Sequence, residues 1–299
     1  MRIGLILPIA EEDGEDGARP YPYIRDLAVA AEAAGLDSLW VFDHLLFRFD
    51  GETSGQYECW TILSAVAEAT RRVELGTLVM CTGFRNAALL AKMAATLDAV
   101  SGGRLILGIG AGWHDPEYEA FGYPTDYKVS RFEESLAVIS GLIREGRADV
   151  DGRFVKAKDA VLRPPARPDL PILIAGKKPR MLELVARHAD AWNLAWFGLP
   201  DERLARVRGE LVEACERVGR DPASLAITVG VTVRYGAAPA SENGGPALTG
   251  TPDDVAAGLA AHAEAGADHL IVALEPCTPE TLAEFADAIG RFRAGVGSP

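Results

Sequence analysis

Two adjacent residues, Asp43 and His44, place a carboxylate beside an imidazole directly after the apolar segment SLWVF, which predicts a strand. Imidazole is the side chain whose unperturbed pKa lies closest to neutral pH, so His44 is the best candidate for an acid–base group. The pair could instead serve only to cap a turn. Because it stands at the end of a strand, we favour catalysis and expect His44 and Asp43 to be catalytic.

A second candidate region follows the strand predicted over 104–109, where glycines alternate with other residues before an aromatic and ionisable cluster. Gly108, Gly110 and Gly112 remove side chains at the strand end, so we expect a flat ligand to lie against this backbone, with Trp113 as one wall. The same glycines also suit a tight strand-to-helix turn. Because Trp113 stands where a dinucleotide fingerprint requires its third glycine, a Rossmann site is excluded.

A third region, the sequence GKKPR from Gly176 to Arg180, precedes a helix predicted over 181–188. Backbone N–H groups at a helix start, the helix dipole and three cations together favour an anion. The chain has 43 acidic and 30 basic residues, so a local cluster of cations stands out. An ordinary solvated turn is the alternative. We expect Lys177, Lys178 and Arg180 to bind a phosphate group.

The remaining histidines and cysteines indicate little further chemistry. His114 is a second acid–base candidate, and as a loop residue it is expected to contact solvent, whereas His188, His262 and His269 are expected to be structural. The four cysteines are scattered without a CxxC pair, so we expect neither a metal site nor a disulfide framework. No serine-nucleophile, P-loop or zincin motif occurs in the sequence.

The elements that must position these groups alternate between short apolar strands and helices. Strands are predicted over 2–8, 38–42, 72–80, 104–109, 171–175, 191–195, 225–233 and 269–274. Helices are predicted over 23–34, 58–70, 86–100, 131–143, 181–188, 201–218, from Thr251 onward, and over 279–292.

Strands that are apolar throughout are typical of a parallel sheet buried on both faces, and eight strand–helix units close most readily as a barrel. The sequence therefore predicts an α/β fold, a (β/α)8 TIM barrel forming one domain over 1–299. Residues 145–171, with a hairpin near Asp151 and Gly152, form an insertion before the fifth strand. In this fold the chemistry lies at the carboxyl ends of the strands, where all three candidate regions fall.

Composition limits the partners and the compartment. The net charge of −13 over 299 residues argues against binding nucleic acid, which requires a basic surface. The N-terminal apolar run is too short for a signal peptide, and no stretch of some 18 apolar residues occurs, so no membrane association is expected. Scattered cysteines suit a reducing cytoplasm.

Several segments taken together resemble the luciferase-like monooxygenase superfamily, and more narrowly its branch that uses the deazaflavin coenzyme F420. They include AEAAGLDSLWVFDHL, FRNAALLAKMAATLDAVSGGRLILGIGAGWHDPEYEAFG and ILIAGKKPRMLELVARHADAWN. The resemblance covers nearly the whole chain. It implies a luciferase-like barrel that binds a flavin or deazaflavin at the strand carboxyl ends, with hydride exchanged at C5 of a deazaflavin, and it implies a homodimer.

The resemblance also implies roles for individual residues. Asp43 and His44 map to an active-site pair, with His44 as proton shuttle or stabiliser. A non-prolyl cis peptide that supports the cofactor ring is implied between Leu78 and Val79. The other side of the ring maps to Gly110, Ala111, Gly112 and Trp113, and the phosphate end maps to Gly176, Lys177, Lys178 and Arg180.

Two departures from the family pattern limit this transfer. Similar sugar-phosphate dehydrogenases place a glutamate acid where this chain has Trp113, so a glucose 6-phosphate activity is not expected. Related chains carry a run of glycines where this one has Lys177 and Lys178, which leaves the choice between F420 and FMN open.

The sequence leaves three candidate functions for this protein. The preferred one is a cytoplasmic oxidoreductase that transfers a hydride between F420 and a small organic substrate, with His44 handling the proton. The alternative is an FMN-dependent monooxygenase that uses O2, and the third is a non-catalytic binding protein. The loops over 11–20 and 235–250 are expected to shape the substrate pocket.

Overall fold

The computed structural model of the chain describes residues 1–11, 17–236 and 245–296. Two compact units are distinguished, one formed by 1–7, 25–40 and 176–299, the other by 8–24 and 41–175. Each unit is described by itself. The two loops expected to shape the substrate pocket include 12–16 and 237–244, which lie outside the described residues, so that prediction stays open.

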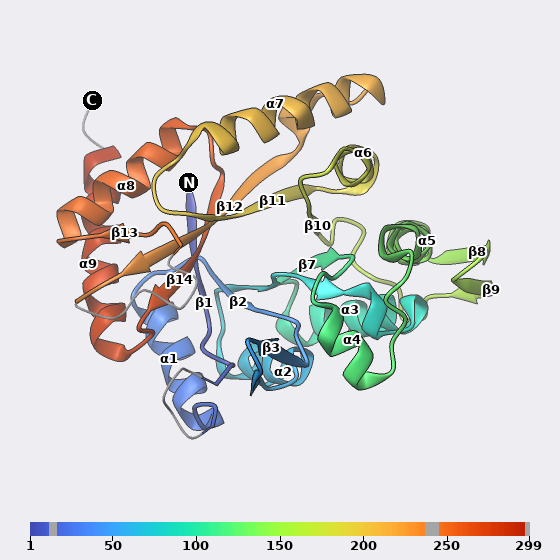
Figure 1. The fold of residues 1–299 in the computed structure, drawn as a ribbon, viewed down its shortest axis with the longest axis horizontal. Helices are drawn as coiled ribbons and strands as arrows, with labels where there is room; N and C mark the ends of the chain where they lie inside the picture. The colour runs from blue at the N-terminus through green and yellow to red at the C-terminus, as the bar shows by residue number, and fades with distance from the viewer. Residues whose placement is uncertain (12–16, 237–244, 297–299) are drawn as a thin grey trace. The chain divides into compact units, whose positions relative to one another are not determined.

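Parallel strands form the core of the first unit, in the order β11–β12–β14–β1–β2 (Figure 1). Their side chains are mostly buried, as expected for all-apolar strands of a parallel sheet. The strands are β1 (Arg2–Ile6), β2 (Ser38–Val41), β11 (Ala191–Phe197), β12 (Ala226–Arg234), β13 (Leu248–Thr249), which pairs with β12, and β14 (His269–Glu275). The helices are α1 (Tyr21–Ala33), α6 (Pro179–His188), α7 (Glu202–Arg217), α8 (Pro252–Glu264) and α9 (Pro279–Val296).

In the second unit, β7 pairs in parallel with β5, β6 and β10. Both β5 and β6 pair with β7, so they are two halves of one strand interrupted at Leu78 and Val79. The strands are β3 (Leu46–Phe49), β4 (Glu52–Gly55), β5 (Glu74–Thr77), β6 (Met80–Cys81), β7 (Leu105–Gly110), β8 (Arg147–Asp151), β9 (Lys156–Val161) and β10 (Ile172–Ala175). The helices are α2 (Cys59–Ala69), α3 (Ala87–Ser101), α4 (Asp115–Phe121) and α5 (Lys128–Ser140).

Every predicted strand and helix is present, within a few residues of its predicted bounds. The insertion before the fifth strand is confirmed as the β8–β9 hairpin, whose turn begins at Asp151 and which extends beyond α5 in Figure 1. The capping residues act as the sequence indicates. Thr251 and Asp254 form a reciprocal capping box at the start of α8, with Pro252 at the first helical position.

The described elements that were not predicted include the two-residue strand β13, the β3–β4 hairpin and helix α4. The β3–β4 hairpin pairs Leu46 with Gly55 and Phe49 with Glu52, and α4 follows the glycines after β7. The hairpin signal was present in the sequence as Asp50-Gly51, the dipeptide favoured in tight turns, flanked by the alternating residues LFRF. Helix α4 was missed because it has only seven residues, too few for a helical repeat to show.

His269 is fully buried at the start of β14, which confirms its structural role. Its Nε2 lies 2.7 Å from Ser38 Oγ, and Trp40 Nε1 donates to the same hydroxyl over 2.7 Å. Burial, together with the positive charge of Arg2 and of the N-terminal amine, lowers the pKa of His269 to about 3. The imidazole is therefore neutral in the folded chain throughout the range in which an exposed histidine takes up a proton.

We predict that this histidine makes stability depend on pH. The neutral His269 imidazole contributes fully to the free energy of unfolding above the unfolded-state pKa near 6.5. This contribution is lost as the pH falls below that value, because only the unfolded chain then binds the proton. Between pH 7.5 and 5.5 the loss is about 1.4 kcal/mol. Urea unfolding at both pH values measures the fall in the free energy of unfolding. This fall should be smaller by about this amount for His269→Gln than for the natural chain. An equal fall in both proteins would contradict the assignment.

Candidate active site

Asp43 lies just after β2 and is buried with both oxygens engaged. Oδ2 accepts from the Cys81 backbone N–H at 2.7 Å and from Arg85 Nη1 at 2.6 Å, while Oδ1 accepts from Arg85 Nη2 at 3.0 Å and from the Cys59 thiol at 3.3 Å. A bidentate guanidinium and a backbone N–H fix this carboxylate in place. Asp43 thus ties the end of β2 to β6, an arrangement that fits a support of the site better than direct contact with a substrate.

Arg85 also bonds Glu58, through Nη2 and Oε1 at 2.7 Å. Asp43, Glu58 and Cys59 bring possible metal-ligand atoms within 4.8 Å of one another. The guanidinium already binds the two carboxylates, and burial beside Asp43 raises the pKa of the Cys59 thiol well above its ordinary value. A neutral thiol is a poor metal ligand. The cluster is therefore organised around an arginine, not around a cation site.

His44 is held by a buried carboxylate. Its Nδ1 lies 3.0 Å from Oε1 of Glu117, which is 1% exposed, and Oε2 of the same carboxylate accepts from the Leu45 backbone N–H at 2.8 Å. Among the described residues no group hydrogen-bonds His44 Nε2, and the side chain is 14% exposed. The imidazole is therefore fixed at one nitrogen and available at the other.

Glu117 was missed as a site residue by reasoning from the sequence. It lies 73 residues from His44 in the chain and in the first turn of α4, so only the fold brings the two together. The available signal was its place in the ionisable cluster directly after the strand-end glycines. A carboxylate that orients a histidine through Nδ1 is a general arrangement of acid–base sites.

His114 does not behave as expected, because it is buried rather than in contact with solvent. Its Nε2 accepts from the Arg48 backbone N–H at 3.0 Å, and its ring packs 4.9 Å from that of Phe49. Burial lowers its pKa, with the nearby His44 and Arg48 acting in the same direction and Glu117 opposing them. His114 thus anchors the β3–β4 hairpin as a neutral acceptor.

The Cβ positions of the glycines of β7 face atoms of the chain itself, and a flat ligand lying against this backbone stays a prediction. A Cβ on Gly108 would lie 1.9 Å from the Thr77 carbonyl oxygen, and one on Gly110 would lie 2.7 Å from Val79 Cγ2. These glycines therefore admit the bulge between β5 and β6. The Leu78–Val79 peptide bond in that bulge is cis, as the family resemblance implies.

Gly112 makes room for Tyr118. It has a φ of +73°, and a Cβ there would lie 2.0 Å from the Tyr118 hydroxyl oxygen. That hydroxyl donates to the Ala111 carbonyl at 2.8 Å and lies 2.8 Å from Cys81 Sγ. The Tyr118 hydroxyl thus fixes the loop from Gly110 to Trp113. The contact of this loop with a cofactor stays a prediction.

The cationic segment lies in the first unit, at the start of α6. Lys177, Lys178 and Arg180 are exposed, and Lys178 is the N-cap residue of this helix. The Gly176 carbonyl accepts from Trp192 Nε1 at 2.7 Å, which fixes the backbone where the cationic segment begins. A second non-prolyl cis peptide bond, which lies in the first unit, joins Ala195 to Trp196 near the end of β11.

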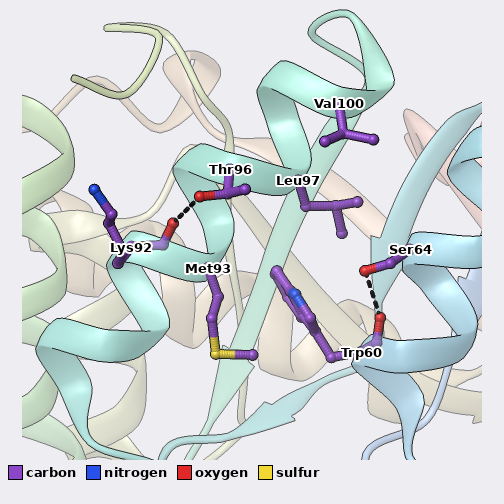
Figure 2. Close-up of a pocket in the computed structure, with 7 residues that line it drawn as sticks. All are labelled: Trp60, Ser64, Lys92, Met93, Thr96, Leu97 and Val100. Carbon is purple, nitrogen blue, oxygen red and sulfur yellow. Dashed lines mark hydrogen bonds between the residues drawn. The ribbon is translucent and has the colours of Figure 1, made fainter. Parts of the chain in front are cut away.

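A hollow of about 210 Å³ lies between α2 and α3 (Figure 2). Hydroxyls in its wall bond to the backbone of their own helices, Ser64 to Trp60 and Thr96 to Lys92. The lining residues are Trp60, Ser64, Lys92, Met93, Thr96, Leu97 and Val100. None of the predicted site residues lines this hollow, and its wall presents no acid–base pair.

Comparison with known proteins identifies the family. Residues 1–243 match the family described as luciferase-like monooxygenase, and the chain belongs to it. A curated relative, a phthiodiolone/phenolphthiodiolone dimycocerosates ketoreductase from Mycobacterium sp. (strain JLS), is 36% identical over 236 residues, 71% of this chain. The chain spans 62% of the length of that relative.

Solved structures confirm the fold class. An F420-dependent secondary alcohol dehydrogenase, solved with an F420–acetone adduct, is 18% identical with a TM-score of 0.78 and covers 98% of this chain and 99% of its own. The EDTA monooxygenase from Chelativorans sp. BNC1 is 15% identical with a TM-score of 0.81, covering 100% and 95%. The chain thus has the luciferase-like TIM-barrel fold. Among the described helices, none has the length and apolar character needed to span a bilayer.

We predict that Asp43→Asn destabilises the fold, because it leaves the largely buried Arg85 guanidinium with only the half-exposed Glu58 as counter-charge. The loss should be about 3–5 kcal/mol in the free energy of unfolding, measured with urea. Glu183→Gln, which breaks an exposed pair with Arg187 on α6, is the matched control and should leave the free energy of unfolding nearly unchanged. Equal losses for the two variants would refute a supporting role for Asp43.

Proposed function

We propose that the chain is an F420-dependent oxidoreductase that transfers a hydride between the deazaflavin and the carbonyl or secondary alcohol of a small organic substrate. The observation that carries this proposal is the His44–Glu117 pair, an imidazole fixed at Nδ1 and available at Nε2. The names of two similar proteins, a ketoreductase and an F420-dependent secondary alcohol dehydrogenase, support this choice of reaction.

His44 suits the proton half of this reaction. When bound, the deazaflavin accepts or supplies a hydride at C5. Oxidation of an alcohol also releases the hydroxyl proton, which His44 can take at Nε2 while Glu117 stabilises the charge that develops on the ring. In the reverse direction the imidazolium returns that proton to the carbonyl oxygen. The buried carboxylate keeps the same nitrogen directed at the substrate in both directions.

The residues present fit a cofactor with a flat ring and a phosphate. The exposed cations at the start of α6 suit an anionic group, because the helix dipole and neighbouring backbone N–H groups add to their charge. In the first unit, Lys177, Lys178 and Arg180 would hold a phosphate. In the second unit, taken by itself, the segments at Leu78–Val79 and Gly110–Trp113 would support a flat ring. A homodimer and a cytoplasmic location complete this proposal.

A second candidate is an FMN-dependent monooxygenase, supported by the similarity to EDTA monooxygenase. The test is anaerobic turnover. Loss of the absorbance of oxidised F420 on adding a secondary alcohol, without oxygen, supports the proposed function. Oxygen consumption that requires reduced FMN, with no change in F420, would overturn it.

We predict that His44→Ala lowers turnover by about two to four orders of magnitude with the dissociation constant of the cofactor nearly unchanged. Glu117→Gln should lower turnover by a smaller factor, since the amide oxygen still accepts from the Leu45 N–H while the negative charge is lost. Steady-state kinetics and equilibrium binding separate the two effects. A parallel loss of cofactor affinity in His44→Ala would indicate a structural role for this histidine.

For the cationic segment, we predict that replacing Lys177, Lys178 and Arg180 together by alanine weakens cofactor binding. It should also flatten the dependence of binding on salt, because screening acts on the removed charges. Lys158→Ala, an exposed lysine on β9, is the control and should leave both properties unchanged. An unaltered dissociation constant in the triple variant would rule out this phosphate site.

A further inference from the structure

Four ring side chains form a closed circuit of contacts that includes His44. Ring centroids lie 4.4 Å apart for His44 and Phe47, and 6.1 Å apart for Phe47 and Phe49. The circuit is completed by Phe49 and Trp113 at 6.3 Å and by Trp113 and His44 at 5.6 Å. Rings from the β3–β4 hairpin and from the loop after β7 thus gather around the candidate acid–base residue.

Two rings of this circuit are exposed to solvent. Trp113 is 61% exposed and Phe49 is 45% exposed, whereas His114, which packs against both, is buried. A cluster that served the fold alone would be expected to bury its tryptophan. Neighbouring exposed apolar groups instead mark a surface that binds something. We call the exposed rings of Phe49 and Trp113 the aromatic surface.

The β3–β4 hairpin holds Phe49, one of the two rings of the aromatic surface, in a fixed position. Phe47 and Phe49 are two residues apart on β3 and therefore lie on the same face of the strand. The hairpin is held at its root by Glu117, which accepts from the Leu45 N–H, and nearer its turn by the buried His114, which accepts from the Arg48 N–H. The carboxylate that orients His44 therefore also fixes the aromatic surface beside it.

We propose that the aromatic surface binds the non-reacting part of the substrate, and that the substrate is a secondary alcohol or ketone bearing a flat aromatic group. The identity of the reacting group rests on the proposed function. The rings of Phe49 and Trp113 are near-parallel, 21° apart, so they offer similarly oriented faces on which another flat ring can stack. Trp113 also meets His44 at 75°, so a group stacked there has its reacting carbon beside the imidazole.

Calorimetric titration of the full chain, without added cofactor, tests this proposal with two secondary alcohols. The flat probe is 1-(2-naphthyl)ethanol and the flexible apolar probe is 2-octanol. The naphthyl alcohol should bind about tenfold more tightly, and Trp113→Ala or Phe49→Ala should remove that preference while changing 2-octanol binding less than about twofold. Trp113→Phe keeps a ring and should retain most of the preference.

Phe121→Ala removes another exposed ring, at the end of α4, that takes no part in the circuit, and it should leave both affinities unchanged. An unchanged naphthyl affinity in Trp113→Ala, or an equal loss in Phe121→Ala, would overturn the proposal. Because binding is measured without turnover, the two proposals fail separately. Selective naphthyl binding without F420 turnover would refute the proposed function alone, and F420 turnover of 2-octanol without the preference would refute the aromatic surface alone.

Discussion

The geometry of the candidate site depends on one buried carboxylate. Glu117 accepts from His44 on one oxygen and from the Leu45 N–H on the other, so a single side chain of α4 fixes both the imidazole and the root of the β3–β4 hairpin. Burying an ionised group is costly unless its hydrogen bonds are satisfied. Here both partners come from the segment after β2, and the bond at Nδ1 leaves His44 Nε2 without a hydrogen-bond partner among the described residues.

Asp43 is a second buried carboxylate, with partners different from those of Glu117. It binds Arg85 through two oxygens and the Cys81 N–H through one of them, which joins the end of β2 to the second half of the interrupted strand. The adjacent residues Asp43 and His44 thus have different partners: Asp43 binds Arg85 and the Cys81 N–H, and His44 binds Glu117.

The alternating pattern of strands and helices could be predicted from the sequence because apolar runs and capping residues are local signals, as the capping box of Thr251 shows. His44 could be predicted because it directly follows a strand. Glu117 and His114 could not be assigned, since their partners lie 73 and 66 residues away in the chain. The packing of Gly108 could not be predicted for the same reason, because the atom that a Cβ there would meet belongs to Thr77 on a neighbouring strand.

We propose that this chain uses a deazaflavin beside a carboxylate-oriented histidine. Equilibrium binding of oxidised coenzyme F420 and of FMN to the same purified protein, followed by the fluorescence of each ring, tests this proposal. We expect micromolar or tighter binding of F420 and a clear preference for it over FMN. Preference for FMN would overturn the proposal and indicate an oxygen-using flavin enzyme, and binding of neither would indicate a non-catalytic protein.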